Sequence, residues 1–314
     1  MAQQMIEVEG LVKTFGSGDD SVKAVRGVNF AVNEGEIFGL LGANGAGKST
    51  VVLMLATLLR PTAGNARIAG HDVVSSPDAA RLAFGAALQE TGLDPLQKGR
   101  ELLELHGRLY GYTAPQSVRR AEELLDLVNL SSDGDRRIGT YSGGMRRRLD
   151  LAAALIHHPR ILFLDEPTTG LDPASRRDIW DEVASLRKDG VTVLLTTQYL
   201  EEADQLADRV AIMADGQIAA TGTPTELKAG MGADVVEVTL ADEETAERAA
   251  AAVGSEAKVV GHEIRVGATD GPAVLARVVG ALKEAGIEPH GVTLSQPTLD
   301  DVFLNLTDGR GDAS

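Results

Sequence analysis

Residues 42–50 are the first stretch of this chain that could do chemistry. They read Gly-Ala-Asn-Gly-Ala-Gly-Lys-Ser-Thr and fit the spacing of a loop that cradles phosphate groups, G-x-x-x-x-G-K-[ST]. Its glycines let backbone N–H groups approach phosphate oxygens, and a helix that begins here favours negative charge. Lys48 would reach the β- and γ-phosphates and the Ser49 hydroxyl would face Mg²⁺. We expect a nucleotide to be bound by Gly42, Asn44, Gly45, Gly47, Lys48, Ser49 and Thr50.

Two adjacent carboxylates form the second chemical pattern. Asp165 and Glu166 follow the apolar run 161–164 and precede Pro167. One acid can support the water shell of Mg²⁺ while the next orients and deprotonates an attacking water. Adjacent residues of a strand point to opposite faces. The pair therefore serves one site only because the strand stops there, as Pro167 ensures.

Three single side chains lie where predicted strands end. Phe15 precedes the loop 16–20 and either stacks on a nucleotide base or fills a core or strand edge. Gln89 ends the apolar run 82–88, at the edge of an α/β sheet where ligands bind, although a surface glutamine is the alternative. Gln198 follows the predicted strand 191–196, so its side chain should emerge at the same edge, near the phosphates.

A second anion site is suggested by Ser142, Gly143 and Gly144. Ser142 can cap the helix predicted at 145–156, and the two glycines expose the first N–H groups of that helix. The alternative, taken alone, is an ordinary N-cap followed by flexible glycines.

The elements that must position these residues follow from hydrophobic periodicity. Buried strands are predicted at 36–41, 66–68, 82–88, 161–166 and 191–196, and helices at 49–59, 101–110, 115–128, 145–156 and up to 188 after the cap Asp172. Short antiparallel strands are expected before residue 41. The pattern predicts an α/β core with a mixed sheet and a helical insertion at residues 91–157.

The pattern changes near residue 231. Strands at 235–240, 258–266 (two strands) and 287–294 alternate with helices at 243–253 and 273–285, and a last helix includes 299–304. The order βαββαβ predicts a small ferredoxin-like α+β domain. We therefore divide the chain into a nucleotide-binding domain, 1–230, and an accessory domain, 231–314, which contains no catalytic set.

Composition restricts the function further. The 314 residues carry a formal net charge of -16, and such a surface repels nucleic acid. There is no cysteine, which excludes disulfides and thiolate metal sites. No run of 18 apolar residues occurs that would cross a bilayer.

Taken in order, the phosphate loop, Gln89, Ser142-Gly143-Gly144, the paired acids and residues 170–172 resemble an ABC transporter ATP-binding subunit. The resemblance covers residues 6 to about 225. Residues 141–148 (Tyr-Ser-Gly-Gly-Met-Arg-Arg-Arg), residues 196–204 and the tail 299–304 (Leu-Asp-Asp-Val-Phe-Leu) are similar to the daunorubicin/doxorubicin-resistance type of exporter.

This resemblance implies ATP and Mg²⁺ as cofactors and a head-to-tail homodimer. Ser142, Gly143 and Gly144 of one subunit would close on the γ-phosphate that Lys48 of the partner subunit binds. Asp172 would link the two subunits. Residues 89–94 would face an integral-membrane partner.

It also implies a role for each remaining site residue. Phe15 would stack on adenine, and Ser49 and Gln89 would hold Mg²⁺. Asp165 would hold the metal through water and Glu166 would be the general base.

The chain departs from the family pattern at three places. Ala43 stands where such loops commonly have Pro, and Tyr141 and Met145 flank the signature where Leu and Gln are commoner. Gln198 stands where the family usually has His. We expect Gln198 to act in catalysis through an amide that carries no charge and does not titrate.

The expected function is the energy subunit of an exporter of drug- or antibiotic-like molecules. MgATP hydrolysis would drive a separate membrane permease, with the chain peripheral on the cytoplasmic side of the cell membrane. One alternative is a soluble ABC ATPase acting on nucleic acid or the ribosome, which predicts basic patches or a second cassette. Another is an ATP-gated binding or immunity protein, which predicts the loss of Glu166 or Lys48. A GTPase is disfavoured because no Asn-Lys-x-Asp motif occurs.

Overall fold

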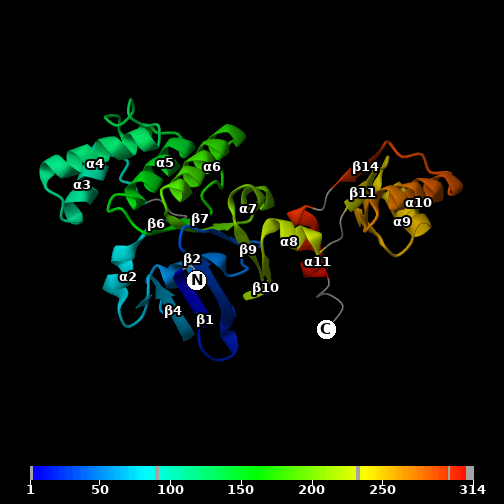
Figure 1. The fold of residues 1–314 in the computed structure, drawn as a ribbon, viewed down its shortest axis with the longest axis horizontal. Helices are drawn as coiled ribbons and strands as arrows, with labels where there is room; N and C mark the ends of the chain where they lie inside the picture. Colours follow the sequence, from blue (N-terminus) through cyan, green and yellow to red (C-terminus); the bar gives the residue numbers. More distant parts are fainter. Residues whose placement is uncertain (1–2, 89–91, 231–233, 296–297, 309–314) are drawn as a thin grey trace. The chain divides into compact units, whose positions relative to one another are not determined.

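The computed structural model describes residues 3–88, 92–230, 234–295 and 298–308. The chain forms two compact units, Met1–Thr221 and Gly222–Ser314, each described here by itself (Figure 1). The division lies earlier than residue 231, where the composition changes. The helix α8 (Pro224–Ala229) lies before that change and belongs to the second unit.

A six-stranded sheet forms the centre of the first unit, in the order β10-β9-β3-β8-β7-β6. Neighbours among β9, β3, β8, β7 and β6 run parallel. The strands are β3 (Ile37–Leu41), β6 (Phe84–Ala87), β7 (Ile161–Asp165), β8 (Thr192–Thr197), β9 (Arg209–Ala214) and β10 (Gln217–Gly222). The carboxyl ends of the parallel strands meet at one edge, which is where the site residues were expected.

Both faces of this sheet are covered, since β3, β7 and β8 are buried at every position rather than at alternate ones. Along β7, Ile161 and Phe163 pack with the N-terminal strands and α1 (Lys48–Leu55), whereas Leu162 and Leu164 pack with the helices of the insertion. Figure 1 shows the same division, with α3 to α6 on one side of the sheet and β1, β2 and β4 on the other.

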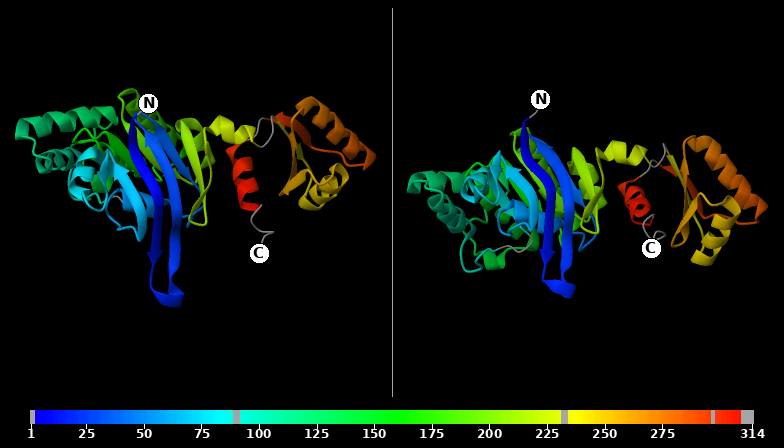
Figure 2. Two further views of the ribbon diagram at one scale, coloured as in Figure 1. Left: turned by 60° about the horizontal axis from the view of Figure 1, so that its bottom comes forward. Right: turned by 90° about the horizontal axis from the view of Figure 1, so that it is seen from below.

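The N-terminal part is a separate antiparallel sheet, β2-β1-β4-β5. Its strands are β1 (Gln4–Phe15), β2 (Val22–Asn33), β4 (Ala63–Ile68) and β5 (His71–Asp72). The expectation of several short strands before residue 41 was wrong, since β1 and β2 are long and lie side by side along their length (Figure 2). Register shifts at four places let the long pair bend without ending it.

The described part of the first unit contains six further helices: α2 (Pro77–Ala83), α3 (Gly99–Leu109), α4 (Ala114–Leu127), α5 (Gly143–Ala154), α6 (Pro173–Lys188) and α7 (Leu200–Leu206). Helix α2 was missed, because the run 82–88 was interpreted as one strand. Instead Pro77 begins a helix and the exposed Leu82 belongs to it. Helix α1 ends at Leu55 rather than residue 59, because Thr57 adopts a left-handed conformation.

The second unit has the predicted βαββαβ order, and its sheet is antiparallel with the order β12-β13-β11-β14. Its elements are β11 (Asp234–Thr239), α9 (Glu243–Val253), β12 (Ala257–Val260), β13 (Glu263–Ala268), α10 (Gly271–Glu284), β14 (Gly291–Ser295) and α11 (Leu299–Asp308). Helices α9 and α10 cover one face and bury its apolar residues. The predicted fold class, an α/β core with an antiparallel N-terminal part and an additional α+β unit, is confirmed. None of the described helices is both long and apolar enough to cross a membrane.

Candidate functional site: a phosphate loop and two carboxylates

The phosphate loop connects β3 to α1, and close backbone contacts require glycine at Gly42 and Gly47. A Cβ atom on Gly42 would lie 2.4 Å from the carbonyl oxygen of Met213, and one on Gly47 would lie 2.4 Å from that of Ala24. Gly47 also has a φ of +101°, which L side chains rarely adopt. A side chain at either position would therefore clash with the backbone around the loop.

Lys48 is buried at the first position of α1, where only 4% of the residue is exposed. Its Nζ donates to the carbonyl oxygens of Gly42 (2.8 Å) and Ala43 (3.1 Å) and lies 3.6 Å from Oε1 of Glu166. Burial lowers the pKa of Lys48, and the charge of Glu166 opposes that shift. The ammonium group is thus desolvated and positioned beside the loop that would hold phosphate.

Asp165 is the last residue of β7, and its side chain faces α1. Its Oδ1 accepts hydrogen bonds from the hydroxyls of Ser49, at 3.1 Å, and Thr196. Thr196 lies on β8, the neighbouring parallel strand, where it pairs with Asp165 in the ladder. Three side chains from α1, β7 and β8 therefore converge at one carboxylate oxygen.

Glu166 follows directly and turns back toward α1. Its φ is +47°, a left-handed conformation that costs a non-glycine residue about 1–2 kcal/mol. The strained residue is held by two hydrogen bonds from its N–H, to the carbonyl and the hydroxyl oxygens of Thr196, each 3.1 Å. Its Oε2 accepts from the hydroxyl of Thr169 at 3.1 Å. This turn places the carboxylates of Asp165 and Glu166 beside the first residues of α1.

A pocket of about 440 Å³ lies at this convergence. It is lined by Ala24, Asn44, Gly45, Gly47, Lys48, Ser49, Thr50 and Glu166. Phe15 is not among these residues; it is 42% exposed at the end of β1, with Nζ of Lys13 5.1 Å from its ring centroid. Gln89 lies outside the described residues. Gln198 follows β8 and makes no hydrogen bond from its side chain to any residue in the described ranges.

The second predicted anion site lies on another surface of the unit. Ser142 caps α5 and accepts a hydrogen bond from the Met145 N–H at 3.2 Å. Ser142 and Gly143 are exposed, and neither they nor Gly144 line the pocket around Lys48. Asp172 caps α6, and its bonds to Ser175 and Ala174 lower its pKa.

The residues present fit Mg²⁺. The ion prefers oxygen ligands, and the hydroxyl of Ser49 and the carboxylate of Asp165 supply them side by side. In the described part of the chain, no group of three or more histidines or acids could hold a metal alone. Magnesium typically takes one or two carboxylates and completes its shell with water and substrate phosphates.

Sequence reasoning missed Thr196 and Arg147. Thr196 is fully buried on β8 and forms hydrogen bonds with both Asp165 and Glu166. Arg147 is also buried, and it donates to the carbonyl of Asp165 at the end of β7. A threonine inside an apolar run and a cation on the buried face of a helix were the available signals.

Comparison with known proteins follows the same division of the chain. Residues 25–169 match the sequence profile of a family described as ABC transporter. Residues 222–307 match the C-terminal domain of DrrA1-3-like ATP-binding proteins.

Two relatives align over almost all of the chain. The daunorubicin resistance ATP-binding protein DrrA3 of Streptomyces coeruleorubidus is 48% identical over 310 residues, covering 98% of this chain and 97% of that protein. The daunorubicin/doxorubicin resistance ATP-binding protein DrrA of Streptomyces peucetius is 45% identical over 307 residues, covering 96% and 92%. A solved structure of a dimeric ATP-binding cassette in a post-hydrolysis state, bound to ADP and Pi, is similar with a TM-score of 0.65 and 27% identity. It covers 70% of this chain and 98% of that one.

Proposed function

Because this chain belongs to the ATP-binding subunits of ABC transporters, we propose that two copies of it bind ATP between them and hydrolyse it. The chain is an ATPase that powers export. The cargo we propose is a drug- or antibiotic-like molecule, in keeping with the names of the resistance proteins that it resembles.

One observation supports the proposed dimer. Lys48 is buried in its own chain, whereas Ser142 and Gly143 at the start of α5 are exposed and do not line the pocket around Lys48. A second copy, turned head to tail, would bring its Ser142, Gly143 and Gly144 to the γ-phosphate that Lys48 holds. Such N–H groups bind an anion well once water is excluded. The similar cassette solved as a dimer with ADP and Pi supports this arrangement.

Within each site the residues have distinct tasks. The N–H groups of the loop and the Lys48 ammonium bind the phosphates. Ser49 and Gln89 would hold Mg²⁺, and Asp165 would hold it through water. The ion would supply positive charge to offset charge that develops on the transferred phosphoryl group.

Two residues act in the hydrolysis step, one at the attacking water and one at the γ-phosphate. The Glu166 carboxylate, oriented by the hydroxyl of Thr169, accepts a proton from that water. Gln198 donates its amide N–H to the γ-phosphate. Phe15 stacks on adenine, and Asp172 contacts the partner subunit.

We place the working protein on the cytoplasmic side of the cell membrane, bound to an integral-membrane permease. Residues 89–94 would face that permease. A soluble, non-transport ABC ATPase is not supported, because the relatives that cover nearly the whole chain are resistance proteins with the same C-terminal unit. The net charge of -16 also disfavours nucleic acid as a partner.

Mixing two inactive variants tests the composite site. Lys48→Ala removes the phosphate-binding side and Ser142→Phe blocks the opposite side. In a mixed dimer one site combines two damaged halves and the other combines two intact halves. We expect each variant alone to be inactive and the mixture to regain part of the phosphate release. A mixture no more active than its components would contradict the shared site.

A further inference from the structure

Arg147 is a buried cation that the mechanism above does not use. It lies on α5 with 8% of its surface exposed. An arginine has five N–H donors in a planar fork, and here all five are used. Two of them hold the end of β6: Nη1 donates to the carbonyl of Leu88 at 2.7 Å and Nη2 to that of Ala87 at 3.4 Å. Gln89 follows directly.

Two more donors hold the chain on both sides of Glu166. Nη2 donates to the carbonyl of Asp165 at 2.7 Å and Nε to the carbonyl of Pro167 at 3.1 Å. Leu88 and Pro167 lie beyond the last paired residues of β6 and β7, where the ladder between the strands has ended. One guanidinium therefore joins the ends of two neighbouring strands just before the proposed metal ligand and around the proposed base.

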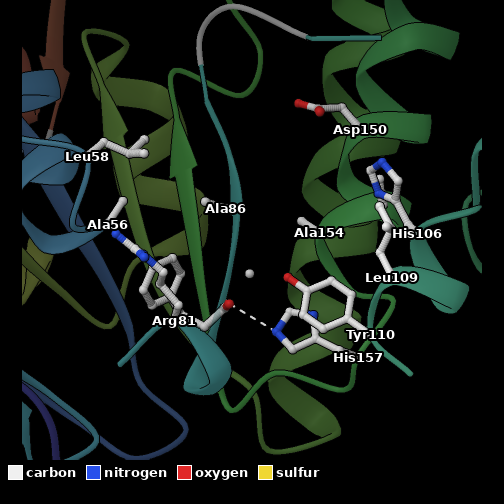
Figure 3. Close-up of a pocket in the computed structure, with 13 residues that line it drawn as sticks. Ala56, Leu58, Arg81, Ala86, His106, Leu109, Tyr110, Asp150, Ala154 and His157 are labelled. Atoms are coloured by element: carbon white, nitrogen blue, oxygen red, sulfur yellow. Dashed lines mark hydrogen bonds between the residues drawn. The ribbon is translucent and has the colours of Figure 1, made fainter. Parts of the chain in front are cut away.

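Asp150 holds this guanidinium from the side of a second pocket. Its Oδ2 accepts from Nη1 of Arg147 at 3.1 Å. The pocket has a volume of about 400 Å³ and lies away from the phosphate loop. In Figure 3, Asp150 and Ala154 of α5 lie beside this pocket, and His157, which follows that helix, lies beside it as well. Burial raises the pKa of Asp150 to about 6, and the charge of Arg147 opposes that shift.

We propose that Arg147 is a positioning residue for ATP hydrolysis and that Asp150 keeps its guanidinium in place. Arg147 acts through the backbone, by fixing the strained turn at Glu166 relative to the segment that carries Gln89. Lysine cannot replace it, because one ammonium group cannot donate to carbonyls on both strands in this planar arrangement. The inference rests on the proposed role of Glu166.

The main test compares Arg147→Lys with Arg148→Lys in the full-length chain. Arg148 is the next residue of α5, and it donates only to the carbonyl of Val128, at 3.4 Å. Binding of a fluorescent ATP analogue gives the fraction of competent sites, and kcat is calculated per competent site. We expect Arg147→Lys to lower kcat about tenfold or more, as loss of one charge-assisted hydrogen bond would. The affinities of the parent, Arg147→Lys and Arg148→Lys for the analogue should agree within about threefold.

A second arm asks whether Arg147 acts through Glu166. If so, Arg147→Lys should change the residual turnover of a Glu166→Gln chain by less than about threefold, because the two losses are not independent. Losses that multiply would assign Arg147 a merely structural role and overturn the proposal. So would a kcat of Arg147→Lys within twofold of the parent. Normal turnover of Glu166→Gln alone would instead overturn the proposed base.

Asp150 provides a milder comparison that leaves the buried cation in place. Asp150→Asn keeps an oxygen that accepts from Arg147, whereas Asp150→Ala removes it. We expect Asp150→Asn to retain kcat within about twofold and Asp150→Ala to lose more than that. Equal kcat values for the two variants would contradict the role of Asp150.

Discussion

Two helices of the first unit begin with residues suited to bind phosphate, and they differ in their surroundings. At the start of α1, Lys48 is 4% exposed and lies within 3.6 Å of the loop carbonyls and Glu166. At the start of α5, Ser142 and Gly143 are exposed, and Ser142 bonds only within its own helix. Lys48 is thus enclosed by its own chain, whereas Ser142 and Gly143 are open to solvent.

Under the proposed head-to-tail arrangement, this difference gives the two helix starts different tasks. Backbone N–H groups bind an anion much more strongly where water is excluded than where it competes. The start of α1 is already desolvated, so it can bind nucleotide in a single chain. The start of α5 gains comparable strength only when another surface covers it. We therefore expect changes at the start of α1 to alter nucleotide affinity and changes at the start of α5 to alter turnover.

The largest effect is expected at the enclosed site. Glu166→Gln keeps the shape of the side chain but removes the base, and loss of general-base assistance typically slows a reaction ~10²–10⁴-fold. Nucleotide binding should persist, because Lys48 and the loop are unchanged. Phosphate-release assays and equilibrium binding measure the two separately. Turnover near that of the parent would remove Glu166 from this role.

The next effect concerns Gln198, which follows β8 at the same sheet edge. A hydrogen bond to a charged group contributes roughly 1.5–3 kcal/mol, so Gln198→Ala should slow turnover about 10- to 150-fold. Gln198→His should remain active and gain a pH dependence near neutrality, because imidazole titrates there and an amide does not. Steady-state assays at several pH values measure both. Turnover of Gln198→Ala within twofold of the parent would show that another group contacts the phosphate.

A glycine at each helix start sharpens the comparison. Gly47→Ala forces a methyl group to within 2.4 Å of a backbone oxygen at a φ of +101°, so nucleotide affinity should fall about tenfold or more.

Gly143→Ala is the matched control. Its methyl group would meet only Leu171, at 3.7 Å, an ordinary contact. Affinity should stay within about twofold while turnover falls, because Gly143 would act on the other subunit's nucleotide. Equal affinity losses in both variants would erase the distinction between the two helix starts.

The smallest effect is expected from removal of the second unit. No residue that lines the pocket around Lys48 comes from beyond Glu166. A chain ending at Gly222 should therefore bind nucleotide within about twofold of the parent, a change of roughly 0.4 kcal/mol. Titration with a fluorescent ATP analogue measures this. Coupling to the permease, or the stability of that complex, should suffer instead. A folded truncated chain that no longer binds would show that the second unit helps to build the site.

Much of the fold could be predicted because its signals are local. The βαββαβ order of the second unit and the cap Asp172 before α6 were read from periodicity and single residues. Long-range and boundary features were missed. Helix α2 is too short to show a period, and the register of β1 with β2 depends on partners far along the chain.

The sequence by itself determined the chemistry that this protein carries: a phosphate loop, two acids after a buried strand and a second glycine-rich helix start. Each is contiguous, so spacing along the chain is enough to recognise it. Only the tertiary structure decided which groups meet. Ser49 bonds to Asp165, 116 positions away in the sequence. Thr196 on β8 bonds to both Asp165 and Glu166, and Arg147 bonds to the chain at the ends of β6 and β7. Such contacts follow from strand order and burial, which no local pattern encodes, because they arise only when distant segments exclude water together.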